Sequence, residues 1–433
     1  MSDNQNFTYL KIYERLKKNI HEGKIPKDSR LDSIRNAALH QGVSTTTMEH
    51  AYNQLLIEGY IRSVPRKGFY IEAIPSSMKN EKEITKPKGD EIQTPFNLAQ
   101  TPDMFEIDRF RKIMNEVLAN EVSIYTPCLP RGEWDLRKAI ASHLRHARDV
   151  VCTPEEVLVA SGIQQLIIAL GEMESKSKNV AYLKPGFSRA LHAFRISGFS
   201  LNGFETVEAL LKSNPDFIYL SPSNLYPSGE VMPINERMKI IEHANKQGTI
   251  LLEDDYNHLF RYNAYQIPTL YSLSSKDNVV YIGSFSRSTL LSIRMSYMVI
   301  PGQLEHHDVS VLAQTVSKPD QLTMARFIER GHYQRHLKRL ARLSKRKNDA
   351  LKKAVEPYLE DGRFLVYGLE SNMHFVIRLE NAKDRMKIIN QLKSMNMAFK
   401  TFDEERPMDV LVPYSGIEID SMQPMIDQIM SVF

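Results

Sequence analysis

Two clusters of polar side chains follow short apolar runs in the middle of the chain, at residues 250–253 and 279–283. Runs of this kind are typical of buried strands, so each cluster is expected at the end of a strand. The clusters contain Asp254 and Tyr256 after the first run, and Ser284, Ser286, Arg287 and Arg294 after the second. Two guanidinium groups can hold an anion through charge-assisted hydrogen bonds. A guanidinium group is permanently protonated, however, so Arg287 cannot act as a nucleophile.

The composition around these residues is that of an ordinary globular protein. With 433 residues, of which 42% are hydrophobic and 25% charged, the chain is long enough for two or three domains. The net charge of +4 is small, so any surface for nucleic acid must be local. Cys128 and Cys152 have neither metal-binding nor redox spacing, and we expect no metal site. No apolar run approaches about 18 residues and the chain begins with polar residues, which predicts a cytoplasmic protein without a membrane span.

The first 72 residues have the pattern of a small separate domain. Apolar residues recur at helical spacing in three segments, at residues 9–20, 34–39 and 48–56. We expect Ser44 and Thr46 to cap the third helix, with Glu49 completing a capping box. Residues 60–71 then predict a β-hairpin with a basic tip. Three helices followed by a hairpin is the order of a winged helix-turn-helix, and we assign residues 1–72 to it.

The outward face of the third helix and the hairpin tip carry groups suited to DNA. Hydroxyl groups, an imidazole and helix-start amides can contact phosphates and base edges in the major groove. The candidate DNA-binding residues are Arg35, Ser44, Thr45, Thr46, Thr47, His50, Arg66, Lys67 and Gly68. The alternative is that the threonines only cap the helix and the arginines are solvated. The hairpin and the local excess of 11 Lys and Arg over 8 Asp and Glu in residues 1–72 favour DNA binding.

Several short motifs of this region resemble the GntR-type winged helix. They are RLDSIR at residues 30–35, GVSTTT at 42–47, EGY at 58–60 and KGF at 67–69. The resemblance implies binding to a double-stranded DNA operator. It places the contacts on Arg35, on the hydroxyl residues Ser44, Thr45 and Thr46, and on the wing at Lys67 and Gly68. Thr45 stands where the family usually has an arginine, which alters one of the DNA-reading groups.

After residue 72 the sequence has first the composition of a linker and then the pattern of an α/β domain. Residues 73–94 are rich in charge and contain no aromatic residue, Val or Leu, which predicts a flexible linker. From residue 95 onward apolar strands alternate with helical segments, the pattern of an α/β domain with a mostly parallel central sheet. The expected strands are residues 179–183, 217–220, 250–253, 279–282 and 297–300, with 364–366 and 374–379 in a smaller C-terminal α+β layer.

Residues 95–433 resemble the fold-type I aminotransferase domain that the MocR-type branch of GntR regulators carries behind its winged helix. The matching segments are Tyr125 with Gly132, SGIQQ at 161–165, PGF at 185–187, YPSG at 226–229, EDDY at 253–256 and residues 284–294. The resemblance implies an aspartate-aminotransferase-like fold, a homodimer, and a site of the kind that binds pyridoxal phosphate.

The resemblance also assigns roles within that site. Ser161, Gly162 and Ile163 would open a helix towards a phosphate, with Arg294 beside it. Phe187 would stack on the pyridine ring, Asp254 would bond the ring nitrogen and Tyr256 the phenolic oxygen. Ser284 and Ser286 complete the predicted ligand site, together with Arg287 where the family has a lysine that forms a Schiff base with the cofactor. We therefore expect no covalently bound cofactor and no catalytic residue, and we favour a small anionic effector over free pyridoxal phosphate.

The sequence thus predicts a dimeric DNA-binding transcription regulator that does not catalyse a reaction. Two alternatives remain open. The first is a true pyridoxal-phosphate-dependent aminotransferase, against which Arg287 counts directly. The second is an effector-independent regulator whose aminotransferase-like domain serves only as a dimerisation scaffold.

One further segment is unusually basic. Residues 326–353 contain 11 Lys and Arg against 2 Asp and Glu. Such a segment is either a solvated helix that links the two layers of the domain, or a helix that also touches DNA phosphates. His332 and His336 lie four residues apart within it, but no cysteine or acidic partner accompanies them as metal ligands would require.

Overall fold

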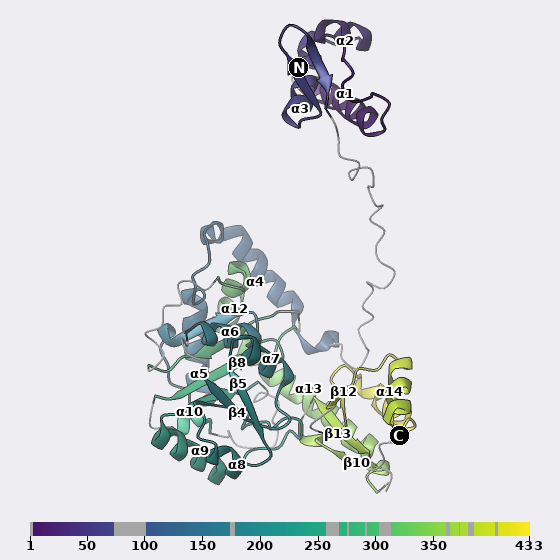
Figure 1. The fold of residues 1–433 in the computed structure, drawn as a ribbon. Helices are drawn as coiled ribbons and strands as arrows, with labels where there is room; N and C mark the ends of the chain where they lie inside the picture. Colours follow the sequence, from purple (N-terminus) through teal and green to yellow (C-terminus); the bar gives the residue numbers. More distant parts are fainter. Residues whose placement is uncertain are drawn as a thin grey trace. The chain divides into compact units, whose positions relative to one another are not determined.

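The chain divides into two compact units, residues 1–92 and residues 93–433 (Figure 1). The computed structural model describes residues 3–72, 101–173, 178–256, 268–274, 277–290, 292–302, 313–360, 364–371, 373–379, 385–402 and 406–433. The linker predicted at residues 73–94 lies outside the described residues. Within the described ranges, no helix is both long and apolar enough to cross a membrane.

The first unit has the predicted order of three helices and a hairpin. Its elements are α1 (Asp3–His21), α2 (Ile34–Gln41), α3 (Thr45–Ile57), β1 (Ile61–Val64) and β2 (Gly68–Ile71), with β1 and β2 antiparallel. A single core forms from the apolar faces, with Ala51 and Leu55 of α3 fully buried between α1 and the hairpin. Leu39 was expected on the buried apolar face of the second helix, but it does not belong to the core, since 80% of it is exposed.

The start of α3 is capped in only one of the two predicted ways. Ser44 is the residue that precedes the helix, and its Oγ accepts the N–H of Thr47 at 3.1 Å. Thr46 lies inside the helix, so the capping box predicted for Thr46 and Glu49 is wrong. Capping needs an extended backbone before the first turn, and only Ser44 has it, with φ of −69° and ψ of 152°.

The second unit contains a seven-stranded sheet in the order β3-β9-β8-β7-β6-β4-β5. Its strands are β3 (Val157–Ala160), β4 (Asn179–Leu183), β5 (Ser200–Phe204), β6 (Phe217–Leu220), β7 (Ile250–Asp254), β8 (Val279–Ser284) and β9 (Ser296–Val299). Strands β5, β4, β6, β7 and β8 are parallel, and β9 runs antiparallel to both β8 and β3. The predicted mostly parallel sheet is confirmed. The strand expected before Ser161 is β3, whose bounds were not predicted, and β5 was not expected.

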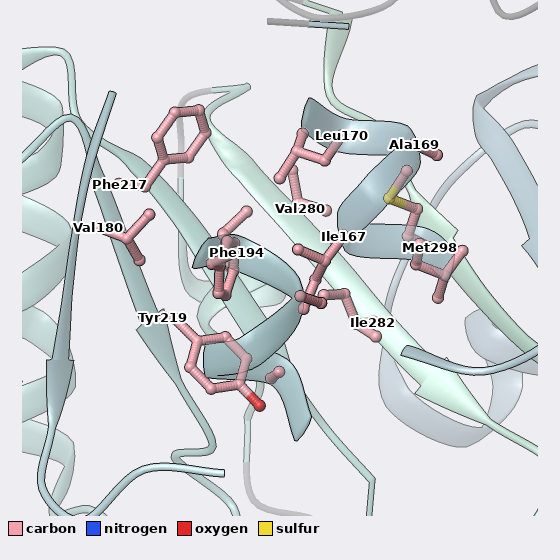
Figure 2. Packing of buried hydrophobic residues seen from close by; sticks show 14 of the residues in the cluster. Ile167, Ala169, Leu170, Val180, Phe194, Phe217, Tyr219, Val280, Ile282 and Met298 are labelled. Carbon is pink, nitrogen blue, oxygen red and sulfur yellow. The ribbon is translucent and has the colours of Figure 1, made fainter. Parts of the chain in front are cut away.

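Helices cover both faces of this sheet. On one face, α6 (Ile163–Met173) and α7 (Ser188–Ile196) bury their apolar sides, and Figure 2 shows Ile167 and Phe194 of these helices against Tyr219 and Ile282 of the strands. On the other face, α8 (Val207–Lys212), α9 (Ile234–Gln247) and α10 (Leu270–Leu273) form a second cluster. A third cluster contains residues of α4 (Ile107–Asn120), α5 (Trp134–Arg148) and α12 (Lys318–Glu329).

The smaller C-terminal α+β layer is also present (Figure 1). Its antiparallel sheet has the order β10 (Phe364–Tyr367), β11 (His374–Leu379), β13 (Arg406–Pro413) and β12 (Lys400–Phe402). The long helix α13 (His332–Val355), with α14 (Arg385–Ser394) and α15 (Met422–Met430), packs its apolar side chains into the core of this layer. The sequence predicted β10 and β11 but not β12 or β13.

Candidate nucleic-acid interface and ligand site

The predicted DNA-binding side chains of the first unit lie on the start of α3, on α2 and at the hairpin turn. Thr45, Thr46 and His50 of α3 are exposed, and so is Arg35 on α2. The turn from α2 into α3 is closed by Gly42, whose φ is +64° and whose N–H bonds the end of α2. These are the positions at which a second helix of a helix-turn-helix presents its N-terminal residues to a groove.

Thr47 differs from the expectation. It is only 8% exposed, and its hydroxyl lies 2.7 Å from that of Ser44. The first turn of a helix points successive side chains about 100° apart, so Thr45 and Thr46 face outward while Thr47 faces the core. Thr47 therefore supports the helix start and does not belong to the outward face.

The hairpin tip brings a further arginine to the predicted wing. Arg66 and Lys67 are exposed at the turn, and Gly68 has φ of +103°. A Cβ added to Gly68 would lie 3.5 Å from Nε of Arg30, because Arg30 forms a β-bridge with Tyr70 next to it. The side chain of Arg30 therefore joins the wing. In the sequence Arg30 shortly precedes α2. Its proximity to the wing follows only from the β-bridge with Tyr70 of β2.

A polar cluster fixes the end of α3 against α1. The hydroxyl of Tyr13 donates to Glu58 at 2.5 Å, and Nζ of Lys17 donates to the same carboxylate at 2.9 Å. These bonds, first among them the one from Tyr13, lower the pKa of Glu58 to about 2. The cluster holds α3 in place without using any of the exposed side chains predicted to contact DNA.

In the second unit, the predicted ligand-site residues gather at one edge of the large sheet. Strand β3 runs in the direction of β8, since both are antiparallel to β9. The carboxyl ends of β3, β4, β6, β7 and β8 therefore lie at the same edge, which is where ligands bind in open α/β sheets. The predicted residues follow these ends: Ser161, Gly162 and Ile163 after β3, Phe187 after β4, Asp254 and Tyr256 at β7, and Ser284, Ser286, Arg287 and Arg294 at and after β8.

Arg287 lies half-buried against an aromatic ring and a sulfur atom. Its Cζ is 5.7 Å from the ring centroid of Tyr256, and its Nη1 is 2.8 Å from Sδ of Met373. Burial lowers the pKa of Arg287 from its ordinary value, while Tyr256, Tyr226 and Asp254 act in the opposite direction. Within the part of the chain that the structure describes, Arg287 forms no ion pair with a carboxylate.

The two aspartates at the end of β7, Asp254 within the strand and Asp255 after it, bond to groups other than Arg287. Asp254 accepts the hydroxyl of Tyr219 at 2.6 Å, and its burial raises its pKa to about 7, with the Tyr219 bond and Arg287 opposing the rise. Asp255 accepts Nε of Arg148 and the hydroxyl of Tyr281, each at 2.7 Å. The ion pair between Arg148 and Asp255 is almost fully buried.

Arg294 and the start of α6 form a second cationic position at the same edge. Arg294 is exposed, and its guanidinium packs so closely on Gly162 that an added Cβ would meet Nη2 at 2.6 Å. Not every expected helix-start amide is available, however. The N–H of Ser161 donates to Oγ1 of Thr315, and that of Gly162 donates to the carbonyl of Ala160, both at 2.9 Å. Ile163 packs its side chain on the core, which leaves only its backbone for a ligand.

The two serines near Arg287 bond within the turn. The hydroxyl of Ser286 donates to the carbonyl of Ile293 at 2.9 Å, and Ser284 accepts the hydroxyl of Ser296 at the same distance. These bonds tie the segment that carries Arg287 to the segment that carries Arg294.

The small sheet contributes residues that the sequence did not indicate as site residues. The ring of Tyr226 lies 6.3 Å from that of Phe187 and 6.0 Å from that of His374, and Nζ of Lys400 is 5.0 Å from its centroid. His374 is buried and bonds the carbonyl of Pro227 at 2.8 Å. Burial lowers the pKa of His374 to about 4, and the charges of Arg287 and Lys400 add to this effect. Lys400 and Arg287 therefore approach the same histidine from two different sheets.

Comparison with known proteins accounts for both units. The family of bacterial regulatory proteins named gntR matches residues 8–71, and the family of class I and II aminotransferases matches residues 102–402. The uncharacterized HTH-type transcriptional regulator YdeL of Bacillus subtilis is 32% identical over 365 residues, covering 80% of this chain and 79% of that protein. The probable rhizopine catabolism regulatory protein MocR of Rhizobium meliloti is 24% identical over 464 residues, covering 98% of this chain and 93% of that protein.

Solved structures extend the similarity of the second unit to its fold. The multiple substrate aminotransferase of Thermococcus profundus superimposes with a TM-score of 0.69 at 18% identity, covering 82% of this chain and 97% of that one. The molecule is therefore a GntR-type helix-turn-helix unit joined to a fold-type I aminotransferase-like unit. The chain belongs to the GntR/MocR-type family of transcription regulators, as its matches to both family descriptions and to these regulators show.

Proposed function

We propose that this regulator binds duplex DNA as a cytoplasmic homodimer and that its aminotransferase-like unit senses a small anion without catalysis. The observation that carries the proposal is Arg287, which follows β8 at the position where the family has its Schiff-base lysine. A guanidinium group cannot form an imine with an aldehyde, since it stays protonated and is not nucleophilic. The aminotransferase alternative requires that nucleophile.

The residues at the sheet edge fit pyridoxal phosphate only in part. Asp254, Tyr256, Phe187 and Arg294 are the residues that would hold its ring and phosphate, and the cofactor would supply an aldehyde there. Arg287 cannot anchor it covalently. The amine of Lys400 also lies in this neighbourhood, but it donates to Oγ of Ser188 at 3.1 Å and lies over the rings of Tyr226 and Phe402. We therefore propose an anionic effector in preference to the cofactor.

The carboxylates near Arg287 bond to other groups, which supports the proposal that Arg287 binds an anionic ligand. A buried guanidinium without a counter-charge is costly, and an internal carboxylate would have removed the need for a ligand. Asp254 and Asp255 instead bond Tyr219 and Arg148. Arg287 and Arg294 are thus two cations at one sheet edge, which suits a phosphate or carboxylate metabolite. This arrangement counts against the alternative in which the second unit is only a scaffold.

Exposed apolar side chains support the homodimer. Five large ones fall within seventeen residues of the second unit, from the end of α4 to the start of α5. They are Leu118, Val122, Tyr125, Leu129 and Trp134, and 80% of Val122 and 85% of Tyr125 are exposed. A monomer seldom presents so much apolar surface, and we propose that a second copy of this chain covers it. Sedimentation of V122E/Y125E should show a monomer, while Ile196→Glu, an exposed apolar position on α7, should leave the dimer intact.

The absence of covalent cofactor chemistry has a direct test. The purified wild type should be colourless after incubation with pyridoxal phosphate and gel filtration, and borohydride should fix no pyridoxyl group on any lysine. Mass spectrometry of the reduced protein checks this, with Lys400 as the peptide to inspect first. An adduct on Lys400 would mean that another amine has replaced the lost lysine, and the proposal would fail. Arg287→Lys serves as the positive control, since it restores an amine at the end of β8.

A further inference from the structure

The long helix α13 separates its charged residues from its buried ones along its whole length. Its buried face packs into the protein through Tyr333, His336, Leu340, Ser344, Lys347, Leu351 and Val355. The exposed face carries six cations, which we call the basic face: Arg335, Lys338, Arg342, Lys345, Arg346 and Lys353. At about 100° per residue these six side chains fall within an arc of about 100°, on the side opposite Leu351.

The basic face is linear and nearly free of negative charge. It runs from Arg335 to Lys353, which corresponds to about 27 Å of helix at 1.5 Å per residue. The one exposed carboxylate on this face of α13 is Asp349, which pairs with Lys345 at 3.2 Å. An exposed pair of this kind contributes little and leaves most of the positive charge uncompensated.

The cations of α13 that lie outside the basic face bond to other parts of the protein. Arg339 donates to the carbonyl of Asp103 at 2.5 Å and lies 3.4 Å from Glu106, and Lys347 donates to the carbonyl of Ser415 at 2.7 Å. In contrast, Lys338, Arg346 and Lys353 have no ion-pair partner among the residues that the structure describes. Arg339 and Lys347 thus bond to other elements of the fold. The hydrogen bonds of Arg335 and Arg342 on the basic face stay local, to Arg330 and His332 and to the carbonyl of Lys338.

We propose that the basic face of α13 binds the phosphate backbone of duplex DNA. The proposal rests on the proposed DNA-binding function of the first unit and adds a second contact, made by the aminotransferase-like unit. Duplex DNA presents one negative charge per about 1.7 Å of its axis, so a straight row of cations can neutralise several phosphates at once. Such contacts carry no sequence information and strengthen binding to DNA around the operator.

The test measures how DNA affinity depends on salt. The full-length wild type is compared with K338Q/R342Q/R346Q on a labelled random-sequence duplex of about 60 base pairs, over a series of NaCl concentrations. Glutamine keeps the helix-forming tendency and removes the charge. Loss of three phosphate contacts should lower the slope of log K against log salt by about 3 and weaken binding roughly tenfold or more.

A matched variant separates a local contact from total charge. K212Q/K246Q/K393Q removes the same three charges from exposed positions on α8, α9 and α14, and its salt slope should equal that of the wild type. Equal slopes for all three proteins, or equal losses in both triple variants, would overturn the proposal. Unchanged DNA binding with lost binding of a polyglutamate peptide would assign the face to an acidic protein instead, which also overturns it.

The first unit supplies the remaining control. R35A/K67A alters only the winged helix, so it should weaken DNA binding whether or not α13 contacts DNA. Loss in R35A/K67A without loss in the α13 variant would leave the proposed function intact and remove only this inference. Thermal melts by circular dichroism verify folding, and the single substitution Lys338→Gln, with an expected slope change of about 1, provides a second measurement.

Discussion

The proposed DNA-binding surface of the first unit and the proposed ligand site of the second use polar residues in opposite ways. Thr45, Thr46, Arg35 and Lys67 are exposed and surround a small core that does not depend on them. At the sheet edge of the second unit, Asp254 and Asp255 are buried, and each is bonded to a neighbouring strand or helix.

This difference follows from what each surface must meet. A duplex is a large external polyanion, so the side chains that contact it remain solvated until it arrives. A small ligand must be met by charges that already have their final positions, because orienting them afterwards costs binding free energy. The bonds around Asp254 and Asp255 would supply this order in advance at the proposed ligand site. Four predictions test the contrast, from the largest expected effect to the smallest.

The largest effect is expected from Asp254→Asn on the stability of the second unit. The pKa of Asp254 is raised to about 7, above its ordinary value of 3.8, so the stability of the wild type falls as the pH rises from about 4 to about 7. Asparagine resembles the neutral form at every pH. The variant should therefore gain stability relative to the wild type by about 2 to 3 kcal/mol between pH 5 and pH 8.

The measurement is urea unfolding followed by fluorescence of Trp134, the single tryptophan of the chain, which lies in the second unit. Glu58→Gln in the first unit should show the opposite sign, and its unfolding is followed by circular dichroism because Trp134 lies in the other unit. The pKa of Glu58 is lowered to about 2, so its contribution is present above about 4.5 and is lost as the pH falls towards 2. A pH-independent difference between Asp254→Asn and the wild type would show that Asp254 is not held neutral by burial.

The second prediction concerns ligand-dependent stability at Arg287. An anion that binds the native state at 100 times its Kd should stabilise the wild type by about 2.7 kcal/mol and Arg287→Ala much less. Thermal shifts across phosphorylated and carboxylated metabolites detect this. Arg195→Ala, an exposed arginine at the end of α7, controls for general charge effects. If no compound shifts the wild type while Arg287→Ala melts much earlier, the scaffold alternative would be favoured.

The third prediction concerns the affinity for DNA. Arg35→Ala and Lys67→Ala should each weaken operator binding by about 1 to 3 kcal/mol for a base contact, and by less for a phosphate contact. Neither should change the melting temperature, because both side chains are exposed. The operator is first selected from random duplexes with the wild type, and affinities are then measured by fluorescence anisotropy. Unchanged affinity and salt dependence in folded Arg35→Ala would show that DNA binds to another face of the first unit.

The smallest effect separates capping from DNA contact at the start of α3. Ser44→Ala should destabilise the first unit by about 1 kcal/mol, since its Oγ caps the helix. Thr46→Ala should leave stability nearly unchanged and alter only DNA affinity, because Thr46 lies inside the helix and is exposed. Helix melting by circular dichroism, paired with DNA binding, distinguishes the two. A larger loss of stability in Thr46→Ala than in Ser44→Ala would contradict the observed cap.

Much of this protein was determined by its sequence alone. Strands β4, β6 and β11 have the predicted bounds because each is a short, mostly apolar run. The helices and hairpin of the first unit follow from helical spacing and a basic turn. Strand β5 escaped prediction because its residues include Asn202 and Gly203, and it lies at the edge of the sheet, where burial imposes little pattern. The strands and helices that were predicted depend on local patterns of apolar residues, which can be read from the sequence.

Only the tertiary structure decided which side chains meet. Thr47 turns inward although it sits in a run of three threonines, because the angle of the first helical turn selects Thr45 and Thr46 for the surface. Tyr219 reaches Asp254 because β6 and β7 are neighbours. Met373, just before β11, contacts Arg287, and Lys400 of β12 lies over the ring of Tyr226, so both come from the other sheet. These contacts join residues that are far apart in the sequence, and Ser188 and Lys400 are 212 positions apart. Local spacing carries no signal of such pairs, because only packing brings the two sheets together.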